Sequence, residues 1–269
     1  MLTAFWPLDA VARIVWDIHP ELVRLGPVAI RYYSLGFLLT FGIGFHIIRW
    51  MFRSEAKPEE DLNALLNYMV VGTIVGARLG HCLFYDPAFY LSHPLEIVKV
   101  WHGGLASHGG AIGICVALYL YTRSRPGQPY LWLLDRMVVP TALGGFFIRI
   151  GNLFNSEILG TPADVPWAIV FKRIDDVPRH PAQLYESLAY GLIFALLLWV
   201  YSGRRSRTPS GLLLGLFLAI VFSFRFLVEF VKIRQAAYGL ELPISVGQWL
   251  SIPAAILGIL LLIRARRSP

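Results

Sequence analysis

The densest group of reactive polar side chains lies in the segment RIGNLFNSEILG, residues 149–160. Arg149 can bind a phosphodiester through its planar guanidinium fork, and Asn152 and Asn155 can donate hydrogen bonds to ester or phosphate oxygens. Glu157 can orient an arginine or accept a hydrogen bond. This combination favours a site for a phosphorylated ligand, and a purely structural helix-capping role is the alternative.

A histidine lies in the glycine-rich segment that precedes this one, WHGGLASHGG, residues 101–110. Gly109 and Gly110 follow His108 and allow a backbone or a substrate to approach closely. A neutral imidazole is a suitable general base at physiological pH, because it can accept a proton from a thiol or a hydroxyl. We therefore take His108 as the candidate base, ahead of His102 in the same loop.

Two further polar pairs fall inside apolar stretches. Arg78 and His81 are three residues apart and share a helix face, as do Arg225 and Glu229 at i and i+4. A charged group at the centre of a span costs about 2.5–3.5 kcal/mol by insertion scales, so it normally faces an interior site, a partner or water. For the first pair the alternative is snorkelling or a helix-to-helix hydrogen bond, and for the second it is an internal ion pair.

Composition indicates that these groups are positioned by a membrane protein. The 269 residues are 56% hydrophobic and only 15% charged, with a mean hydropathy of +0.59, whereas about a quarter of a soluble domain is charged. The excess apolar surface must face lipid. The net charge of +7 is spread over short loops between apolar stretches, which argues against a nucleic-acid partner. Cys82 and Cys115 lie in apolar segments and are expected to be buried, without a metal-ligand spacing.

The apolar pattern predicts an all-α integral membrane protein with about seven transmembrane helices. We expect one membrane domain over residues 1–269, an interfacial arm at 1–26, and a small extracytoplasmic insertion at 151–181 between the fourth and fifth helices. The predicted spans are residues 28–50, 62–85, 104–121, 131–150, 184–201, 211–231 and 245–263.

The distribution of basic residues predicts the orientation, since short cytoplasmic loops are rich in arginine and lysine. Four basic clusters follow alternate spans and would share the cytoplasmic side. They are Arg49, Arg53 and Lys57; Arg123 and Arg125; Arg204, Arg205 and Arg207; and Arg264, Arg266 and Arg267. The amino terminus is then outside and the carboxyl terminus cytoplasmic.

Taken in chain order, seven segments resemble the succession of motifs in the prolipoprotein diacylglyceryl transferase family. They are IRYYSLG, VGARLGHCLFYD, GGLASHGG, RIGNLFNSEILG, RHPAQLYE, FRFLVEF and SVGQWLSIP, and they cover nearly the whole chain. RIGNLFNSEILG is the most specific, because it is similar to the family signature GRxGNFxNxE-x-x-G. The departures are Ile148 for the leading glycine, Leu153 for phenylalanine, His81 where members often have tyrosine, and Val221 where some do.

The resemblance implies a multi-pass enzyme of the bacterial cytoplasmic (inner) membrane. Such an enzyme transfers the sn-1,2-diacylglyceryl group of phosphatidylglycerol to the lipobox cysteine of a preprolipoprotein signal peptide, forming a thioether and releasing glycerol phosphate. The nucleophile belongs to the substrate, so both cysteines of this chain should be dispensable. No metal or other cofactor is expected.

The resemblance and this chemistry together assign roles. His108 is expected to be the base, and Arg149 and Arg225 the clamp for the departing phosphate. Glu229 would hold Arg225, and Gly160 would allow a tight backbone turn. The residues expected to bind substrate are Tyr33, Arg78, Asn152, Asn155, Glu157, Gly160 and Glu229.

Other functions stay open at this point. A membrane transporter would also have several spans and an internal polar site, but would need a polar pathway that continues to the cytoplasmic side. A transferase for another phospholipid headgroup is the nearest enzymatic alternative. The segment RHPAQLYE, residues 179–186, fits either positioning of the outer unit or contact with the substrate.

Overall fold

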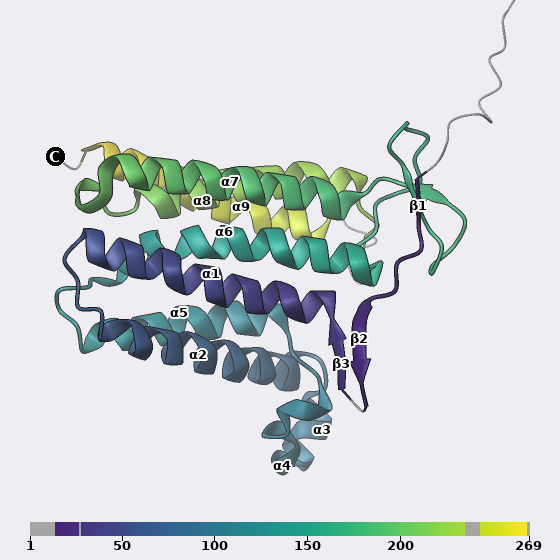
Figure 1. Ribbon diagram of the computed structural model, residues 1–269, viewed down its shortest axis with the longest axis horizontal. Helices are drawn as coiled ribbons and strands as arrows, with labels where there is room; N and C mark the ends of the chain where they lie inside the picture. The colour runs from purple at the N-terminus through teal and green to yellow at the C-terminus, as the bar shows by residue number, and fades with distance from the viewer. Residues whose placement is uncertain (1–13, 27, 235–242, 268–269) are drawn as a thin grey trace, which may run out of the picture. The chain divides into compact units, whose positions relative to one another are not determined.

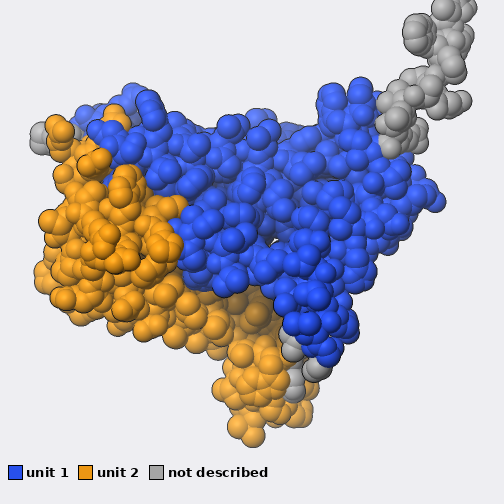
Figure 2. Space-filling model, in the orientation of Figure 1, with its two compact units in different colours: residues 1–44, 138–203, 212–269 blue, residues 45–137, 204–211 orange. Residues whose placement is uncertain are grey.

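The computed structural model describes residues 14–26, 28–234 and 243–267 and divides into two compact units. The first unit consists of residues 1–44, 138–203 and 212–269, and the second of residues 45–137 and 204–211 (Figure 2). The α-helices are α1 (Tyr32–Ser54), α2 (Asp61–Phe84), α3 (Pro87–Ser92), α4 (Pro94–Ile97), α5 (Ser107–Arg123), α6 (Tyr130–Asn155), α7 (Ala182–Arg204), α8 (Leu212–Val228) and α9 (Val246–Arg267). Short 3-10 helices are η2 (Val100–His102), η3 (Arg205–Arg207) and η4 (Glu229–Val231).

Within the described residues, six helices are long and apolar enough to cross a membrane: α1, α2, α6, α7, α8 and α9. The prediction of a mostly helical, multi-pass membrane protein is therefore confirmed, and the count of seven spans is not. The expected third span is α5, which has 17 residues. At 1.5 Å per residue it is about 25 Å long, somewhat less than the ~30 Å of a bilayer's hydrocarbon core.

The mostly helical chain also contains five short strands among the described residues, which the sequence analysis did not predict. Strands β1 (Ile14–Trp16), β4 (Ile169–Phe171) and β5 (Pro178–Arg179) form a small sheet in the order β1-β4-β5, and β2 (Glu21–Leu25) pairs with β3 (Val28–Arg31) as a hairpin. β1 runs parallel to β4 with Ile14 opposite Ile169. Of the predicted interfacial arm at 1–26, residues 1–13 lie outside the described residues, and the remainder contains β1 and β2.

The small sheet of the first unit packs beside the end of α6 (Figure 1). Leu153 of α6 forms a buried cluster with Ile169 and Phe171 of β4. The Trp16 ring meets the Phe154 ring edge to face, with 5.4 Å between centroids. The insertion predicted at 151–181 thus starts inside α6, and the connection between α6 and α7 is anchored to the helix by these apolar side chains.

Close contacts at glycine join the long helices of the first unit. A Cβ placed at Gly36 of α1 would lie 3.2 Å from the Phe147 carbonyl oxygen of α6, and one at Gly258 of α9 would lie 2.4 Å from the Ala219 nitrogen of α8. Helices in lipid associate through such close packing, because the hydrophobic effect does not drive one apolar helix onto another there.

In the second unit, α2 and α5 run antiparallel with their backbones in contact. Gly72, Gly76 and Gly80 of α2 face Gly109 and Gly113 of α5. A Cβ at Gly76 would lie 2.4 Å from the Gly109 carbonyl oxygen, and a Cβ at Gly113 would lie 2.1 Å from the Gly72 carbonyl oxygen. Residues four apart on each helix form one face, so each glycine series presents a continuous flat strip to the other helix.

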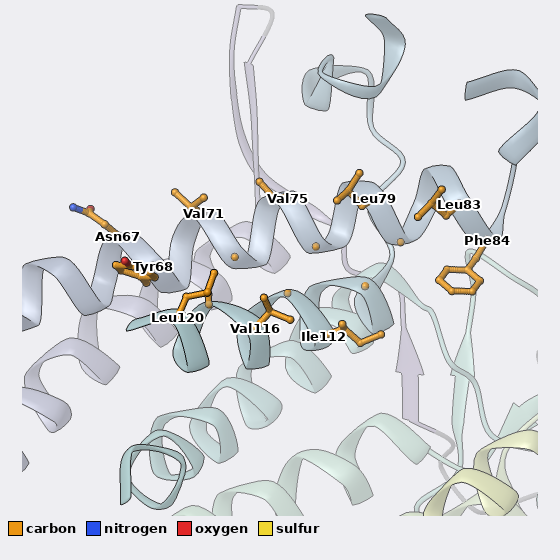
Figure 3. Close-up of a pocket in the computed structure, with 16 residues that line it drawn as sticks. Asn67, Tyr68, Val71, Val75, Leu79, Leu83, Phe84, Ile112, Val116 and Leu120 are labelled. Atoms are coloured by element: carbon orange, nitrogen blue, oxygen red, sulfur yellow. The ribbon is translucent and has the colours of Figure 1, made fainter. Parts of the chain in front are cut away.

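An apolar groove of about 600 Å³ runs along this helix pair. Figure 3 shows its length, from Asn67 and Tyr68 at one end to Phe84 at the other. Branched side chains from both helices form its walls, including Val75, Leu79 and Val116. The glycines form its floor, since they add no side chain between the two backbones.

We predict that Gly76→Ala destabilises the protein by about 1–3 kcal/mol, because the new methyl group must push α5 away from α2. Gly42→Ala in α1 is the matched control: a Cβ there meets nothing within 4 Å, and alanine favours a helix. Thermal unfolding in detergent measures both. Equal midpoints for the two variants would contradict the close packing of α2 and α5.

Candidate active site

The site in the first unit starts where α6 ends. Ser156 has a left-handed φ of 55° and closes the helix in a Schellman arrangement. Its N–H donates to the Leu153 carbonyl at 3.0 Å, and the Glu157 N–H donates to the Asn152 carbonyl at 2.9 Å. Ile158 also has a positive φ of 56°. These two turns bring the Glu157 side chain back onto the last turns of α6.

Amide groups connect Glu157 to the arginine of the same segment. Asn152 Nδ2 donates to Glu157 Oε2 and Asn155 Nδ2 donates to Glu157 Oε1, each at 3.2 Å. Asn152 Oδ1 accepts a hydrogen bond from Arg149 Nη1 at 3.2 Å. From α7, Gln183 donates to the Glu157 backbone carbonyl at 2.5 Å. Asn152 therefore binds the carboxylate with one end of its amide and the guanidinium with the other.

A chain of ion pairs continues from the other side of the guanidinium. Arg149 Nε lies 3.2 Å from Glu186 Oε2, and Glu186 Oε1 lies 3.4 Å from Lys232 Nζ. Lys232 Nζ lies 3.0 Å from Glu229 Oε1, and Ser245 Oγ donates to Glu229 Oε2 at 2.8 Å. Each of these four charged side chains is at most 12% exposed. Positive and negative groups alternate along the chain, as burial in a low dielectric requires.

Backbone hydrogen bonds join the loop that follows α6 to the segment that follows η4. Gly160 forms an antiparallel bridge with Lys232. The Thr161 N–H donates to the Val231 carbonyl at 2.9 Å, and the Ile233 N–H donates to the Leu159 carbonyl at 3.1 Å. This pairing fixes the Lys232 backbone, so its side chain can reach both carboxylates.

Gly160 serves this pairing in a different way from the one predicted. Its φ is not positive, unlike that of Gly103 or Gly104, so a left-handed backbone is not what requires a glycine here. A Cβ at Gly160 would instead lie 2.2 Å from the His180 carbonyl oxygen. The glycine is required because another stretch of backbone passes directly against it.

The segment before α7 is held by contacts of its own. Arg179 hydrogen-bonds Asp175 and keeps the pKa of that carboxyl below its usual value. The Tyr185 hydroxyl accepts a bond from Trp167 Nε1 at 2.6 Å and lies 3.1 Å from His180 Nδ1. These internal contacts favour a positioning role for RHPAQLYE over direct contact with a substrate.

Comparison with known proteins identifies the family. A family model described as prolipoprotein diacylglyceryl transferase matches residues 20–264. The chain belongs to this family.

Full-length relatives agree with that assignment. The phosphatidylglycerol–prolipoprotein diacylglyceryl transferase of Chloroherpeton thalassium is 55% identical over 258 residues, which cover 96% of each chain. The protein of the same name from Tolumonas auensis is 48% identical over 250 residues, covering 93% of this chain and 96% of its own. That of Porphyromonas gingivalis is 46% identical over 273 residues and covers 96% of each.

Most of the residues predicted for a prolipoprotein diacylglyceryl transferase site lie in the first unit. Tyr33 is packed against the end of α6, where a Cβ at Gly151 would lie 2.5 Å from its ring. Its hydroxyl is within electrostatic range of Glu157 and Arg149. Arg149 and Arg225 both interact electrostatically with the Tyr190 hydroxyl. The predicted residues in this unit are Tyr33, Arg149, Asn152, Asn155, Glu157, Gly160, Arg225 and Glu229.

The predicted ion pair between Glu229 and Arg225 is replaced by another one. Glu229 contacts Lys232 and Ser245 directly, and Arg225 acts on it at longer range. The reason is local: α8 ends at Val228, and Glu229 starts the 3-10 helix η4. With three residues per turn, a 3-10 helix brings Glu229 and Lys232 onto one face.

Two predicted residues, Arg78 and His108, belong to the second unit. The Arg78 side chain is buried, and its guanidinium donates to the backbone carbonyls of Ile97 at 2.9 Å, Glu96 at 2.5 Å, and Gly103 and Gly104. It also lies over the Tyr90 ring at 5.0 Å. Because four backbone carbonyls accept hydrogen bonds from its guanidinium, we propose that Arg78 positions the loop after α4 and does not bind substrate.

His108 is the second residue of α5, and its side chain is exposed. The residue that follows it, Gly109, is in backbone contact with Gly76 and Gly80 of α2. The start of α5 is therefore fixed by the helix pair, while the imidazole remains accessible. An accessible imidazole on a fixed backbone is compatible with the predicted role of a base.

Sequence reasoning did not assign a role to Lys232, and it considered Glu186 only as part of the segment RHPAQLYE. Both are central to the ion-pair chain.

The two cysteines were expected to be buried, which is confirmed for Cys82 and wrong for Cys115. Cys115 lies two residues after Gly113 and so faces away from α2. Among the described residues, no three His, Cys, Asp or Glu side chains form a group that could hold a metal ion.

We predict that Arg78→Gln accelerates backbone hydrogen exchange in residues 94–104 by at least ~10-fold, since hydrogen bonds to a charged group contribute about 1.5–3 kcal/mol each. Arg123→Gln is the control, because Arg123 contacts Tyr119 on its own helix. Exchange is followed by mass spectrometry in detergent. Unchanged exchange in Arg78→Gln would rule out the positioning role.

Proposed function

We propose that the chain is a phosphatidylglycerol–prolipoprotein diacylglyceryl transferase of the bacterial inner membrane, and that the end of α6 is its phosphate site. Family membership over nearly the full chain supports the reaction. The observation that carries the chemistry is Arg149, whose guanidinium is held at Nε and at one Nη1 hydrogen. The remaining N–H groups can bind two phosphate oxygens side by side.

The reaction replaces a carbon–oxygen bond with a carbon–sulfur bond. The thiolate of the lipobox cysteine attacks the glyceryl carbon that carries the phosphodiester oxygen, and a thioether forms. The electron pair of the broken bond leaves with the phosphate, so glycerol phosphate is released. The thiol proton goes to a base, for which His108 is our candidate.

Arg149 and Arg225 supply positive charge for this leaving group. Charge builds up on the bridging phosphate oxygen as its bond to carbon breaks, and preorganised cations stabilise that charge most strongly where water is excluded. Tyr33, Asn152, Asn155, Glu157 and Gly160 would shape the headgroup pocket. Of these, Asn152 and Glu157 hold the arginine geometry through their own hydrogen bonds.

We also propose that α5 is a seventh span. It packs along α2, itself a candidate span, over three successive glycine positions. With seven crossings, the basic clusters after α1, α5, α7 and α9 share the cytoplasmic side, whereas six crossings would divide them between both sides. The amino terminus and the connection between α6 and α7 are then extracytoplasmic.

For the reaction, we expect peptide-dependent glycerol phosphate release from phosphatidylglycerol vesicles and a lipobox peptide. His108→Ala should lower kcat by about 10²–10⁴-fold through loss of the base, and Arg149→Ala and Arg225→Ala by about 10²–10³-fold through loss of charge stabilisation. Cys82→Ala and Cys115→Ala are controls and should remain active. A peptide whose lipobox cysteine is replaced by serine should give no release. A folded wild type without peptide-dependent release would overturn the assignment and favour a transporter.

For the orientation, we expect Asp176→Cys, in a variant lacking Cys82 and Cys115, to react with a membrane-impermeant maleimide in intact cells. Arg123→Cys and Arg205→Cys should react only after the membrane is permeabilised. The reverse pattern at all three positions would overturn the proposed orientation of the chain from the end of α5 onward.

A further inference from the structure

Glu186 occupies a position that the reaction itself does not explain. It lies in the second turn of α7, its side chain is 4% exposed, and each carboxylate oxygen faces a different cation. Oε2 approaches Arg149 Nε at 3.2 Å, and Oε1 approaches Lys232 Nζ at 3.4 Å. A buried carboxylate shared between an arginine and a lysine is costly unless both partners stay in place.

The contact with Arg149 is made at one edge of the guanidinium. The shortest distance involves Nε, and Asn152 takes a single Nη1 hydrogen. A carboxylate that bound Arg149 through both Nη groups would occupy the same fork that a phosphodiester needs. Arg136 shows a bidentate pairing of another kind, in which Nε and Nη2 both donate to Glu55, at 2.9 and 3.0 Å.

Lys232 explains why Glu186 binds Arg149 at one edge. The ammonium group is held by Glu229 at 3.0 Å and by the backbone bridge of Lys232 to Gly160. It attracts the second oxygen of Glu186 and so prevents that carboxylate from turning fully onto Arg149. The lysine is 7% exposed on its side chain, so solvent screens this attraction only weakly.

We propose that Glu186 is a positioning residue for diacylglyceryl transfer: it holds Arg149 by its Nε edge, with Lys232 as counter-ion, and points the Nη groups at the phosphodiester of phosphatidylglycerol. The proposal rests on the proposed function for the identity of the ligand. Glu186 does not touch the reacting atoms, and Lys232 acts through Glu186.

A purely structural role predicts something different. In that case the Glu186–Lys232 pair would only cross-link α7 to the segment after η4. Replacing both members with neutral side chains removes one buried negative and one buried positive charge, so the buried chain keeps its net charge and the loss of activity would simply follow the loss of stability. If Glu186 positions Arg149, the same double variant is more stable than either single variant but stays impaired in catalysis.

The test compares Glu186→Gln, Lys232→Met and the double variant with wild type. The thermal midpoint, kcat and KM for phosphatidylglycerol, and the Kd of glycerol phosphate by calorimetry are measured for each. We expect the double variant to unfold at a higher temperature than either single variant, with kcat reduced at least ~30-fold and glycerol phosphate bound at least ~10-fold more weakly. KM should change less than kcat, because the aligned fork matters most in the transition state.

Two further variants keep the outcome interpretable. Glu186→Asp retains the charge but shortens the side chain, so it should fold and lose part of the kcat even if the double variant is unstable. Glu59→Gln is the matched control, since Glu59 also binds two cations, Arg49 and Arg53, but is 40% exposed in a loop; its kcat should equal that of wild type.

Wild-type kcat and wild-type glycerol phosphate affinity in the folded double variant, or in Glu186→Asp, would overturn the positioning role alone. Absence of peptide-dependent release from wild type would overturn the proposed function instead. In that event the Kd of glycerol phosphate still decides whether Glu186 orients Arg149 toward a phosphate.

Discussion

The ion pair between Arg149 and Glu186 joins the end of α6 to the start of α7, and much of the surrounding structure follows from the cost of burying these two charges. A charge in a low-dielectric interior requires an opposite charge and hydrogen bonds at close range. Glu186 meets that need for Arg149, Lys232 meets it for Glu186, and Glu229 for Lys232. The bridge between Gly160 and Lys232, and the contact of Ser245 with Glu229, fix the far end of the chain.

The sequence predicted those parts of the site that one local segment contains. RIGNLFNSEILG places Arg149 and Asn152 on neighbouring turns at the end of a helix and Glu157 two residues after it, so their proximity follows from one short segment. Lys232 could not be found in the same way, because Glu186 and the backbone bridge to Gly160 come from other segments, and only Glu229 lies nearby in the sequence. The prediction of an Arg225–Glu229 ion pair was wrong for a related reason. Residues i and i+4 share a face only while the helix is α, and the 3-10 helix η4 begins at Glu229.

The fold shows the same division between local and distant information. Long apolar stretches identified α1, α2, α6, α7, α8 and α9, since a span is a local property of about 20 residues. The sheet could not be predicted, because β1 has three residues and pairs with β4, which lies more than a hundred residues later. The glycine contacts between α2 and α5, in contrast, could have been predicted from the sequence. Gly72, Gly76 and Gly80 repeat the small-xxx-small spacing of closely packed membrane helices, as do Gly109 and Gly113.

Three buried or largely buried arginines illustrate what decides whether such a residue can act on a ligand. Arg78 donates to four backbone carbonyls, and Arg136 donates with Nε and Nη2 to Glu55. Both therefore use their fork to hold the protein together. Arg149 is contacted at fewer points, by Glu186 at Nε and by Asn152 at one Nη1 hydrogen. All three lie in apolar helices with little exposure, so the functional distinction lies in which donors of the guanidinium the protein occupies. An arginine that is fixed at one edge and open at the other combines a rigid position with unused donors, and these are the two properties that recognition of a phosphodiester requires.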